Sequence, residues 1–245
     1  MSKQTIKIII AVVIYIFLMY FLPGLIPEYQ ELIDKGILPS TITPETFSII
    51  MNMTIYVTLF IVVSLLIKNE LVEDFVSLKT YDKKDIFANS VVGYFLLAVG
   101  SGIGSSITIA LGGTGNSENQ QAIAKILTSE YGFVMIICIA LIGPIVEEFI
   151  FRKSLFALCD KLKINRIITI LITSALFGLI HVTSGGDYVE VFPYIFMGIA
   201  MGIAYNMSKN IIVPIIVHVF QNTLSVVSIL YLLPLLEQLQ QNMPQ

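Results

Sequence analysis

The chain has 245 residues, of which 56% are hydrophobic and 13% are charged, with a mean hydropathy of +0.87. A soluble domain carries roughly a quarter charged residues, so this composition excludes an ordinary globular protein of the cytosol. The 15 Phe and 11 Tyr residues exclude a disordered chain, and a net charge of -3 provides no basic surface for nucleic acid. We therefore expect an integral membrane protein, with the lipid bilayer as its first partner.

Seven stretches without charged residues follow one another along the chain, and most are long enough to span a bilayer. A bilayer core about 30 Å thick needs roughly 20 residues of helix, and helices pair every backbone polar group internally. The sequence therefore predicts an all-α, polytopic transmembrane helix bundle of about seven spans, or eight if glycines break the third stretch. Gly100 with Gly104, and Gly198 with Gly202, have the spacing of close helix contacts. The stretches are residues 8–27, 46–67, 86–117, 131–146, 167–186, 191–208 and 210–236.

The basic residues are unevenly divided between the two ends of these predicted spans. Twelve of the fourteen Lys and Arg residues precede the first stretch or follow the second, fourth and sixth, and only Lys35 and Lys125 fall on the opposite side. The positive-inside rule therefore places the N-terminus in the cytoplasm. We expect N-terminal transmembrane helices over 1–125, a helix core that carries the polar motifs over 126–236, and a C-terminal tail over 237–245.

Two adjacent carboxylates interrupt the end of the fourth stretch. An ionisable side chain inside a membrane costs about 2.5 to 3.5 kcal/mol on insertion scales, so each one is a candidate for function. On a helix, Glu148 and Arg152 are four residues apart and can pair, whereas Glu147 points about 100° away. The pattern predicts an ionised Glu148 and a less solvated Glu147 able to take and return a proton. The alternative is that these charges only mark the cytoplasmic end of a span.

The chain contains two histidines, and both lie in apolar stretches. A lone His in a helix is more often a hydrogen-bonded core residue than a ligand or a base. His218 and Asn222, however, are four residues apart and share a helical face, so they aim an imidazole and an amide at one point. Counting the helical rise along an antiparallel hairpin places His181 at roughly the depth of Glu147.

Three motifs stand in a fixed order: Glu-Glu-x-x-x-Arg from Glu147, Phe-x-x-x-His from Phe177, and His-x-x-x-Asn from His218. In a hydrophobic chain, this order resembles the CPBP family of intramembrane endopeptidases, also called the Abi family. The family joins CAAX prenyl proteases with bacteriocin-processing enzymes. The resemblance covers about residues 130–225, and it uses both histidines of the protein.

The resemblance implies an intramembrane endopeptidase that hydrolyses a peptide bond with an activated water. Glu147 is implied as the general base and later acid, holding the water together with His181. His218 and Asn222 are implied as hydrogen-bond donors to the oxyanion of the tetrahedral intermediate, a role typically worth about 3 to 4 kcal/mol for each donor. The implied supporting residues are Glu148, Arg152 and Phe177.

A metal-dependent mechanism is the alternative for the same residues. Glu147, His181 and His218 could bind zinc, because two His and one Glu leave a position open for water. We favour no metal and no other cofactor, since the chain has no His-Glu-x-x-His motif and the glutamate mechanism uses every motif residue.

The expected partner is a peptide or protein substrate in or at the membrane. It is a leader, pheromone or bacteriocin-type peptide, or a CAAX-like protein, and the Ile- and Lys-rich, Trp-free composition favours a bacterial plasma membrane. The excess of Lys and Arg residues on one side of the predicted bundle favours a site that opens to the cytoplasm. The alternative function is a non-catalytic membrane scaffold or bacteriocin self-immunity protein that binds a membrane partner. A transporter is less supported, because no inverted repeat is visible. The substrate and the oligomeric state stay open.

Overall fold

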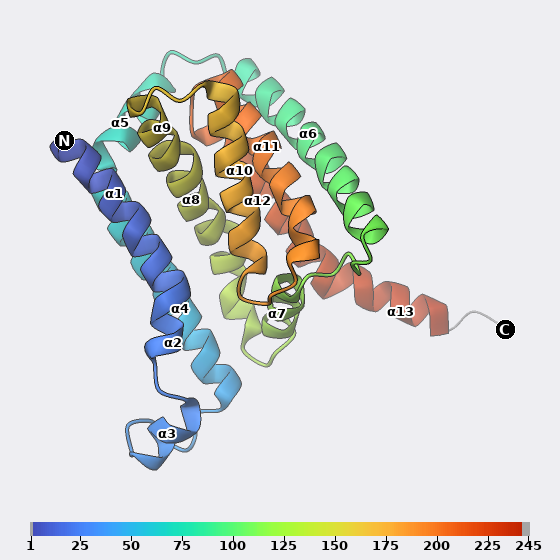
Figure 1. Cartoon of the computed structure of the whole chain (residues 1–245). Coiled ribbons are helices and arrows are strands. Elements are labelled where there is room, and N and C mark those ends of the chain that lie inside the picture. Colours follow the sequence, from blue (N-terminus) through green and yellow to red (C-terminus); the bar gives the residue numbers. More distant parts are fainter. Residues whose placement is uncertain (1, 242–245) are drawn as a thin grey trace.

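The structure is a computed structural model that describes residues 2–241, which form helices and no strand (Figure 1). Among these residues, six helical segments are long and apolar enough to cross a membrane, and a seventh apolar helix, α10, has 17 residues. The predicted all-α, polytopic bundle is therefore confirmed. The six segments are Lys3–Leu25, Pro44–Leu66, Lys83–Ala110, Gly132–Lys161, Tyr188–Ser208 and Ile212–Leu235.

Several of the membrane-crossing segments combine α-helix with π-helical or 3-10 turns, and three short helices connect them. The first segment is made of α1 (Lys3–Ile16), η1 (Phe17–Phe21) and α2 (Leu22–Leu25), and the next two are α4 (Pro44–Leu66) and α6 (Lys83–Ala110). The fourth contains η2 (Gly132–Met135), η3 (Cys138–Ile142), α8 (Gly143–Glu148), η4 (Phe149–Ser154) and α9 (Leu155–Lys161). Then come α10 (Arg166–Val182), η5 (Tyr188–Glu190), α11 (Val191–Ser208), α12 (Ile212–Val227), η6 (Ser228–Leu232) and α13 (Leu233–Gln241). The short helices are α3 (Tyr29–Asp34), α5 (Lys68–Ser77) and α7 (Glu118–Leu127).

Two of these elements refine the sequence-based boundaries. The helix α6 runs unbroken through Gly100, Gly102 and Gly104, so the third stretch does not divide there. The fourth stretch does not end at residue 146, because the helical segment continues through the charged motif to Lys161. In the predicted tail, α13 continues to Gln241, and residues 242–245 lie outside the described residues.

Polar side chains fix where several of the helices begin. The side chains of Thr43, Asp82, Ser117 and Asn165 each accept a backbone hydrogen bond from the first turn of the helix that follows. Such caps pair N–H groups that have no partner inside the helix. These four helices therefore start at defined residues rather than fraying into the connecting loops.

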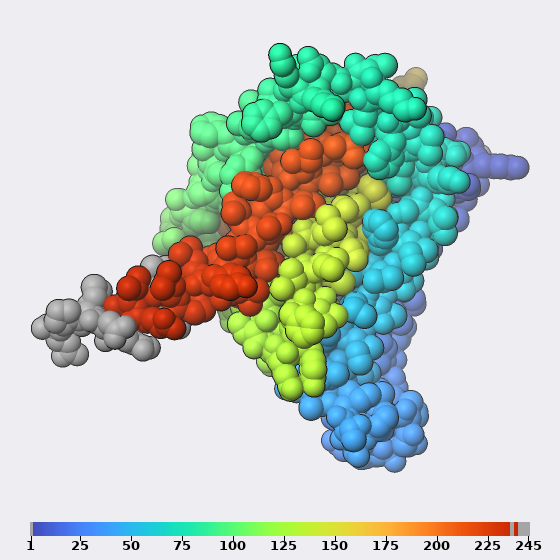
Figure 2. All heavy atoms as spheres, turned by 180° about the vertical axis from the view of Figure 1, so that it is seen from behind, coloured from blue at the N-terminus to red at the C-terminus, as the bar shows by residue number. Residues whose placement is uncertain are grey.

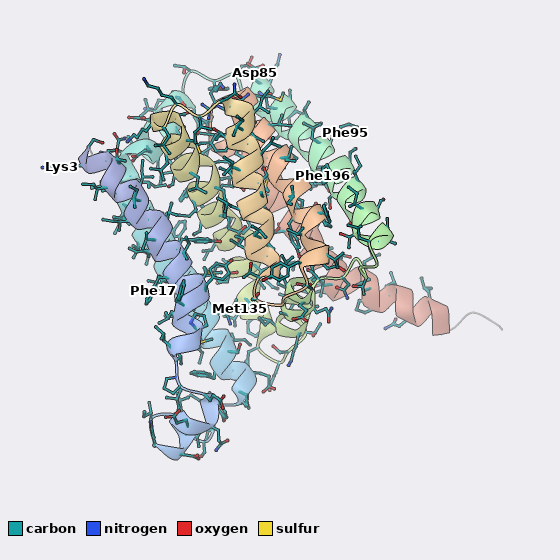
Figure 3. All side chains as sticks on the ribbon, in the orientation of Figure 1. Lys3, Phe17, Asp85, Phe95, Met135 and Phe196 are labelled. Atoms are coloured by element: carbon teal, nitrogen blue, oxygen red, sulfur yellow. The ribbon has the colours of Figure 1, made fainter. Side chains whose placement is uncertain are left out.

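The short connecting helices lie at both ends of the bundle, and the basic residues gather mainly at one of them. The N-terminus and α5 lie at one end and α3 and α7 at the other, while Phe17 and Phe95 project outward from the sides (Figures 1 and 3). At the basic end, Lys161 Nζ donates a hydrogen bond to Thr5 Oγ1, and Asn210 Nδ2 donates to the Asp74 carbonyl. An apolar lateral surface between two polar ends is the surface that a bilayer requires.

Glycines allow α6, α10 and α11 to approach closely, as their four-residue spacing predicts. A Cβ added at Gly104 would lie 2.6 Å from the backbone nitrogen of Pro193. A Cβ added at Gly198 would lie 2.9 Å from Ser174 on α10. These contacts bring the start of α11 against the end of α6, and the middle of α11 against α10.

The N-terminal helices share one hydrophobic core with the helices that carry the motifs. This core includes Tyr15 and Leu59 from the first part of the chain and Phe151, Phe177 and Val217 from the second. Seen from behind, α12 lies between α6 and the segment that begins at Gly132, and α13 projects from the bundle (Figure 2). The residues before position 125 thus help to position the motif residues.

Candidate active site

The two glutamates lie on a helical segment that widens on both sides of α8. The N–H of Gly143 donates to the carbonyl of Cys138, five residues back, which is a π-helical bond. The next residue, Pro144, has no N–H with which to continue this pattern. A second π-helical turn, η4, follows Glu148 directly. Such turns are frequent at functional sites because they change the direction in which neighbouring side chains point.

Asn222 hydrogen-bonds to a backbone carbonyl that has no backbone donor because Pro144 lacks an N–H. In the π-helical pattern, the carbonyl of Ile139 faces Pro144, which offers it no donor. Asn222 Nδ2 donates to this carbonyl at 3.0 Å. An amide nitrogen has two hydrogens, so one N–H of Asn222 is still available for another acceptor. The predicted His-x-x-x-Asn face therefore lies directly over the proline turn.

Glu148 forms a buried ion pair with Arg152, as their spacing predicts. Arg152 Nε lies 3.2 Å from Glu148 Oε2, and Arg152 Nη2 donates to the carbonyl of Gly198 at 3.1 Å. Both side chains are almost completely buried. On the other side of the carboxylate, His218 Nδ1 lies 2.8 Å from Glu148 Oε1. Because a carboxylate paired with Arg152 is an acceptor, Nδ1 of His218 is the donor in this bond.

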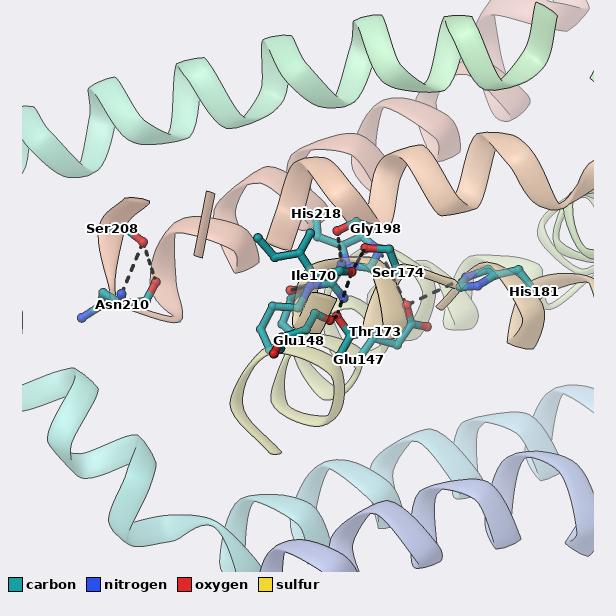
Figure 4. A network of polar contacts seen from close by, with 12 residues as sticks. Glu147, Glu148, Ile170, Thr173, Ser174, His181, Gly198, Ser208, Asn210 and His218 are labelled. Atoms are coloured by element: carbon teal, nitrogen blue, oxygen red, sulfur yellow. Dashed lines mark hydrogen bonds and ion pairs between the residues drawn. The ribbon is translucent and has the colours of Figure 1, made fainter. Parts of the chain in front are cut away.

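Glu147 points away from this pair and faces both histidines (Figure 4). Its Oε2 lies 3.9 Å from His181 Nε2 and 3.7 Å from His218 Nε2. His181 Nδ1 lies 2.7 Å from the carbonyl of Phe177, which can only accept, so Nδ1 carries the hydrogen. In both rings the second nitrogen, Nε2, is therefore the atom directed at Glu147. The structure thus brings together three residues that lie far apart in the sequence.

Aromatic rings fix the orientation of the two imidazoles. The Phe177 ring is fully buried, and its centroid lies 4.5 Å from that of His181 and 5.7 Å from that of His218. The guanidinium carbon of Arg152 lies 5.0 Å from the same ring, within the range of a cation–π contact. The Tyr194 ring stacks on that of His181, with the ring centroids 4.5 Å apart. Phe177 therefore packs against His181, and it also contacts His218 and Arg152.

Two cavities meet at these residues. A small cavity of about 80 Å³ is bordered by Glu147 and by the side chains of Tyr15, Tyr20 and Tyr56. A larger cavity of about 440 Å³ is bordered by Phe177, His218 and a series of Ser, Asn and Gln side chains. His181 and Asn222 border both cavities. The candidate active site therefore lies between a small cavity around Glu147 and a larger one, with His181 and Asn222 bordering both.

Sequence reasoning missed the tyrosines around this site. Tyr15, Tyr20 and Tyr56 come from helices with no recognisable motif, and the Tyr20 hydroxyl donates to the carbonyl of Ile180, next to His181, at 2.9 Å. Tyr194 follows Pro193 at the start of α11, and its hydroxyl lies 2.5 Å from Ser117 Oγ. The only sequence signal was a phenol inside an apolar stretch. Several of the 11 Tyr residues share that signal, so it singles out none of them.

A zinc site would require the side chains of Glu147, His181 and His218 to converge at bonding distance on one point. Among residues 2–241, no group of three His, Cys, Asp or Glu side chains is placed to hold a metal ion. The hydrogen-bond pattern is nevertheless one that metal-binding histidines use, because each Nδ1 donates to an oxygen and each Nε2 is free to bind. Glu147, His181 and His218 therefore have suitable chemistry, although the structure does not bring them to ligand spacing.

Comparison with known proteins identifies relatives of the motif-bearing segment. Residues 129–224 match the family described as Type II CAAX prenyl endopeptidase Rce1-like. The chain is 33% identical over 139 residues to the putative membrane peptidase YdiL of Bacillus subtilis, a match that covers 56% of this chain and 54% of the relative. It is 29% identical over 147 residues to the membrane-embedded CAAX protease MroQ of Staphylococcus aureus, covering 59% of each.

These matches extend over only part of the relatives. The chain spans a little more than half the length of the two relatives named above. No solved structure matches it significantly. Over the segment that contains every motif residue, the comparisons confirm the predicted resemblance to CAAX-type membrane peptidases.

Proposed function

We propose that this protein is an intramembrane endopeptidase of the glutamic type, acting on a peptide bond in a membrane-associated peptide or protein. The observation that carries the proposal is the convergence of Glu147 with Nε2 of His181 and His218. Ionisable groups inside a membrane are costly and mark functional sites. The similarity to membrane peptidases supports the same class of reaction.

Glu147 and His181 are proposed to activate the water. Their facing atoms are 3.9 Å apart, which allows one water to hydrogen-bond to both at about 2.8 Å. With its hydrogen on Nδ1, His181 accepts one water hydrogen at Nε2 while Glu147 accepts the other. Glu147 takes its proton as the water oxygen attacks the peptide carbonyl carbon. When the C–N bond breaks, Glu147 returns that proton to the leaving amine nitrogen.

His218 and Asn222 are proposed to stabilise the oxyanion that forms on the carbonyl oxygen. Asn222 has a second amide N–H for this purpose. His218 already donates from Nδ1 to Glu148, so it can donate from Nε2 only as the doubly protonated imidazolium. Glu148 Oε1 accepts the Nδ1 hydrogen and so orients the ring, as the buried aspartate does in a serine-protease triad. Glu148 thereby acts through His218, and Arg152 Nε lies 3.2 Å from the other oxygen of the carboxylate.

A zinc mechanism is the second candidate, because both Nε2 atoms are left without a hydrogen in the neutral rings. Zinc would be held by Glu147, His181 and His218, and it would polarise the peptide carbonyl and lower the pKa of a bound water. The glutamic mechanism is preferred because it gives Asn222 and Glu148 roles without a further component. No cofactor is required in it.

The proposed location is a bacterial plasma membrane, in agreement with the Bacillus and Staphylococcus relatives. The substrate classes are those expected from the sequence: a leader, pheromone or bacteriocin-type peptide, or a CAAX-like protein. A scaffold that only binds a membrane partner would require neither the Glu147 carboxylate nor the two imidazoles, so it is less favoured.

The test is cleavage of a panel of membrane-anchored fluorogenic peptides by the purified protein in detergent. Glu147→Gln and His181→Ala should each lower the rate by at least 100-fold, while Glu130→Gln, at an exposed carboxylate, should not change it. Activity that survives chelation supports the glutamic mechanism. Loss on chelation with recovery in zinc would make the histidines ligands, and equal rates for the wild type and Glu147→Gln would refute a role for this carboxylate.

A further inference from the structure

Polar and apolar side chains both line the larger cavity, and half of the lining residues are Ser, Asn, Gln, His or Glu, which is a high share inside a membrane. Hydroxyl and amide groups border it from α6, α7 and α12, among them Ser101, Ser105, Gln120, Gln221 and Ser225. Within the described part of the chain, the hydroxyls of Ser101 and Ser105 make no hydrogen bond. Such groups are costly in a bilayer unless water or a ligand pairs with them. The cavity can therefore hydrogen-bond to an occupant with backbone polar groups, while its apolar residues can contact side chains of that occupant.

This cavity lies toward the end of the bundle that carries few basic residues. Along α6, it is bordered from Tyr94 to Ser105, that is, from mid-helix to a point about 8 Å from Ala110 at 1.5 Å per residue. It continues to Gly115 and Ser117 in the loop before α7. None of the described residues that line it is Lys or Arg. The positive-inside rule makes this the extracytoplasmic end.

The opposite side of the site is closed by packed residues. Between the histidines and the basic end lie Arg152, Met201, Ile211 and Val213, all with almost no exposed surface. Closer to the basic end, Asn210 Nδ2 donates to the Asp74 carbonyl and to Ser77 Oγ. These hydrogen bonds hold α5 across this end of the bundle. A peptide from the cytoplasm would have to displace this layer, so the expected cytoplasmic opening does not agree with the packing.

We propose that the site receives its substrate from the extracytoplasmic side of the membrane, as an extended peptide segment presented at the outer face. The cavity is continuous with His181, His218 and Asn222, and its hydroxyl and amide groups can hydrogen-bond to a peptide backbone. A volume of about 440 Å³ holds only a short segment around the cleaved bond. The substrate is thus a segment of a peptide already exported or anchored with that segment outside. That this peptide segment is a substrate rests on the proposed function, whereas the direction of access does not.

Thiol labelling of the full-length protein in intact cells tests the direction of access. Both native cysteines are replaced (Cys138→Ala, Cys159→Ala), and single cysteines are introduced as Ser101→Cys and Ser105→Cys. A charged, membrane-impermeant thiol reagent is then added before or after permeabilisation. We expect both cavity variants to react in intact cells. Reaction only after permeabilisation, or no reaction in either condition, overturns the proposal.

Three further variants serve as controls for orientation and for lipid exposure. Asn116→Cys lies in the exposed loop before α7 and should react in intact cells, while Lys79→Cys should react only after permeabilisation. The reverse pattern would show an inverted protein and overturn the proposal. Ile103→Cys lies between Ser101 and Ser105 in depth but on the exposed face of α6, so it should not react. Equal labelling of Ile103→Cys would contradict access through the cavity.

Two additional measurements separate this proposal from the proposed function. Labelling should be unchanged in a Glu147→Gln background, because it reports access and not hydrolysis. A water-soluble fluorogenic peptide should be cleaved by right-side-out vesicles and not by inverted ones until detergent is added. Cleavage by inverted vesicles alone refutes outward access. Cavity labelling without cleavage by vesicles or by solubilised protein refutes the peptidase activity and leaves outward access supported.

Discussion

A single methyl group on α6 should disturb the site from a distance. In Gly104→Ala, the new Cβ would lie 2.6 Å from Pro193 N, and its three nearest atoms all belong to the backbone of α11. Ordinary contact begins at 3.4 Å, so the start of α11 must move by about 0.8 Å. Tyr194, which stacks on His181, is the next residue along the chain. The matched control is Gly102→Ala, where no atom lies within 4 Å.

The expected magnitudes follow from this displacement. Both variants gain about 1 kcal/mol of helix propensity, so the difference between them isolates the overpacking, typically about 1 to 3 kcal/mol. A shift near 1 Å at a catalytic group can lower a rate by about 100-fold. Thermal unfolding in detergent and peptide cleavage measure the two effects. Equal melting temperatures and equal rates for Gly104→Ala and Gly102→Ala would refute the reasoning.

Three further predictions concern residues around the site and at its two ends. Tyr20→Phe removes the hydrogen bond to the Ile180 carbonyl and should cost about 1 kcal/mol of stability, measured by thermal unfolding, and lower the cleavage rate. Glu190→Gln weakens a carboxylate that accepts three hydrogen bonds from the loop at 111–117, so limited proteolysis should cut this loop faster. Burial raises the pKa of Asp74, so the folded state binds the proton more tightly than the unfolded state does. This contribution to stability is present at low pH and is lost as the pH rises through the raised pKa, and Asp74→Asn should remove it from the pH dependence of unfolding.

Each of these variants has a comparison that would expose a false interpretation. Tyr188→Phe removes an exposed phenol, and a loss of stability equal to that of Tyr20→Phe would contradict the role of the buried hydrogen bond. Glu118→Gln, at an exposed residue beside the same loop, should leave the proteolysis rate unchanged. If the Asp74→Asn variant kept the wild-type pH dependence of unfolding, another group would have to be responsible.

The geometry assigns the two neighbouring glutamates different environments. Glu148 is fully buried and lies between a guanidinium and an imidazole, whereas Glu147 borders a cavity and faces two ring nitrogens. Removing one partner of a buried ion pair typically costs about 3 to 5 kcal/mol, because the other charge stays unpaired. Loss of activity in a Glu148 variant therefore has to be read together with its stability, while Glu147→Gln tests the chemistry more directly.

The fold class and the motif residues could be predicted because both depend on local rules. A span is recognisable from uninterrupted apolar sequence, and the pairing of Glu148 with Arg152 follows from the helical period. The same period places His218 and Asn222 on one face. These relations hold within a single helix, so they do not depend on how the helices pack.

The glycine spacing predicted that some helices pack closely, but which helices contact one another was beyond the reach of the sequence. The small cavity is completed by Tyr15, Tyr20 and Tyr56 because α1, its continuation and α4 pack beside α8, and no spacing along the chain encodes that contact. The side on which the larger cavity lies depends on where α6 and α12 separate and where Met201 and Val213 close the space. The sequence by itself determined the helical segments and the relations within each helix, such as the pairing of Glu148 with Arg152. Only the tertiary structure decided which side chains surround Glu147 and the two histidines, because packing joins residues that local periodicity cannot relate.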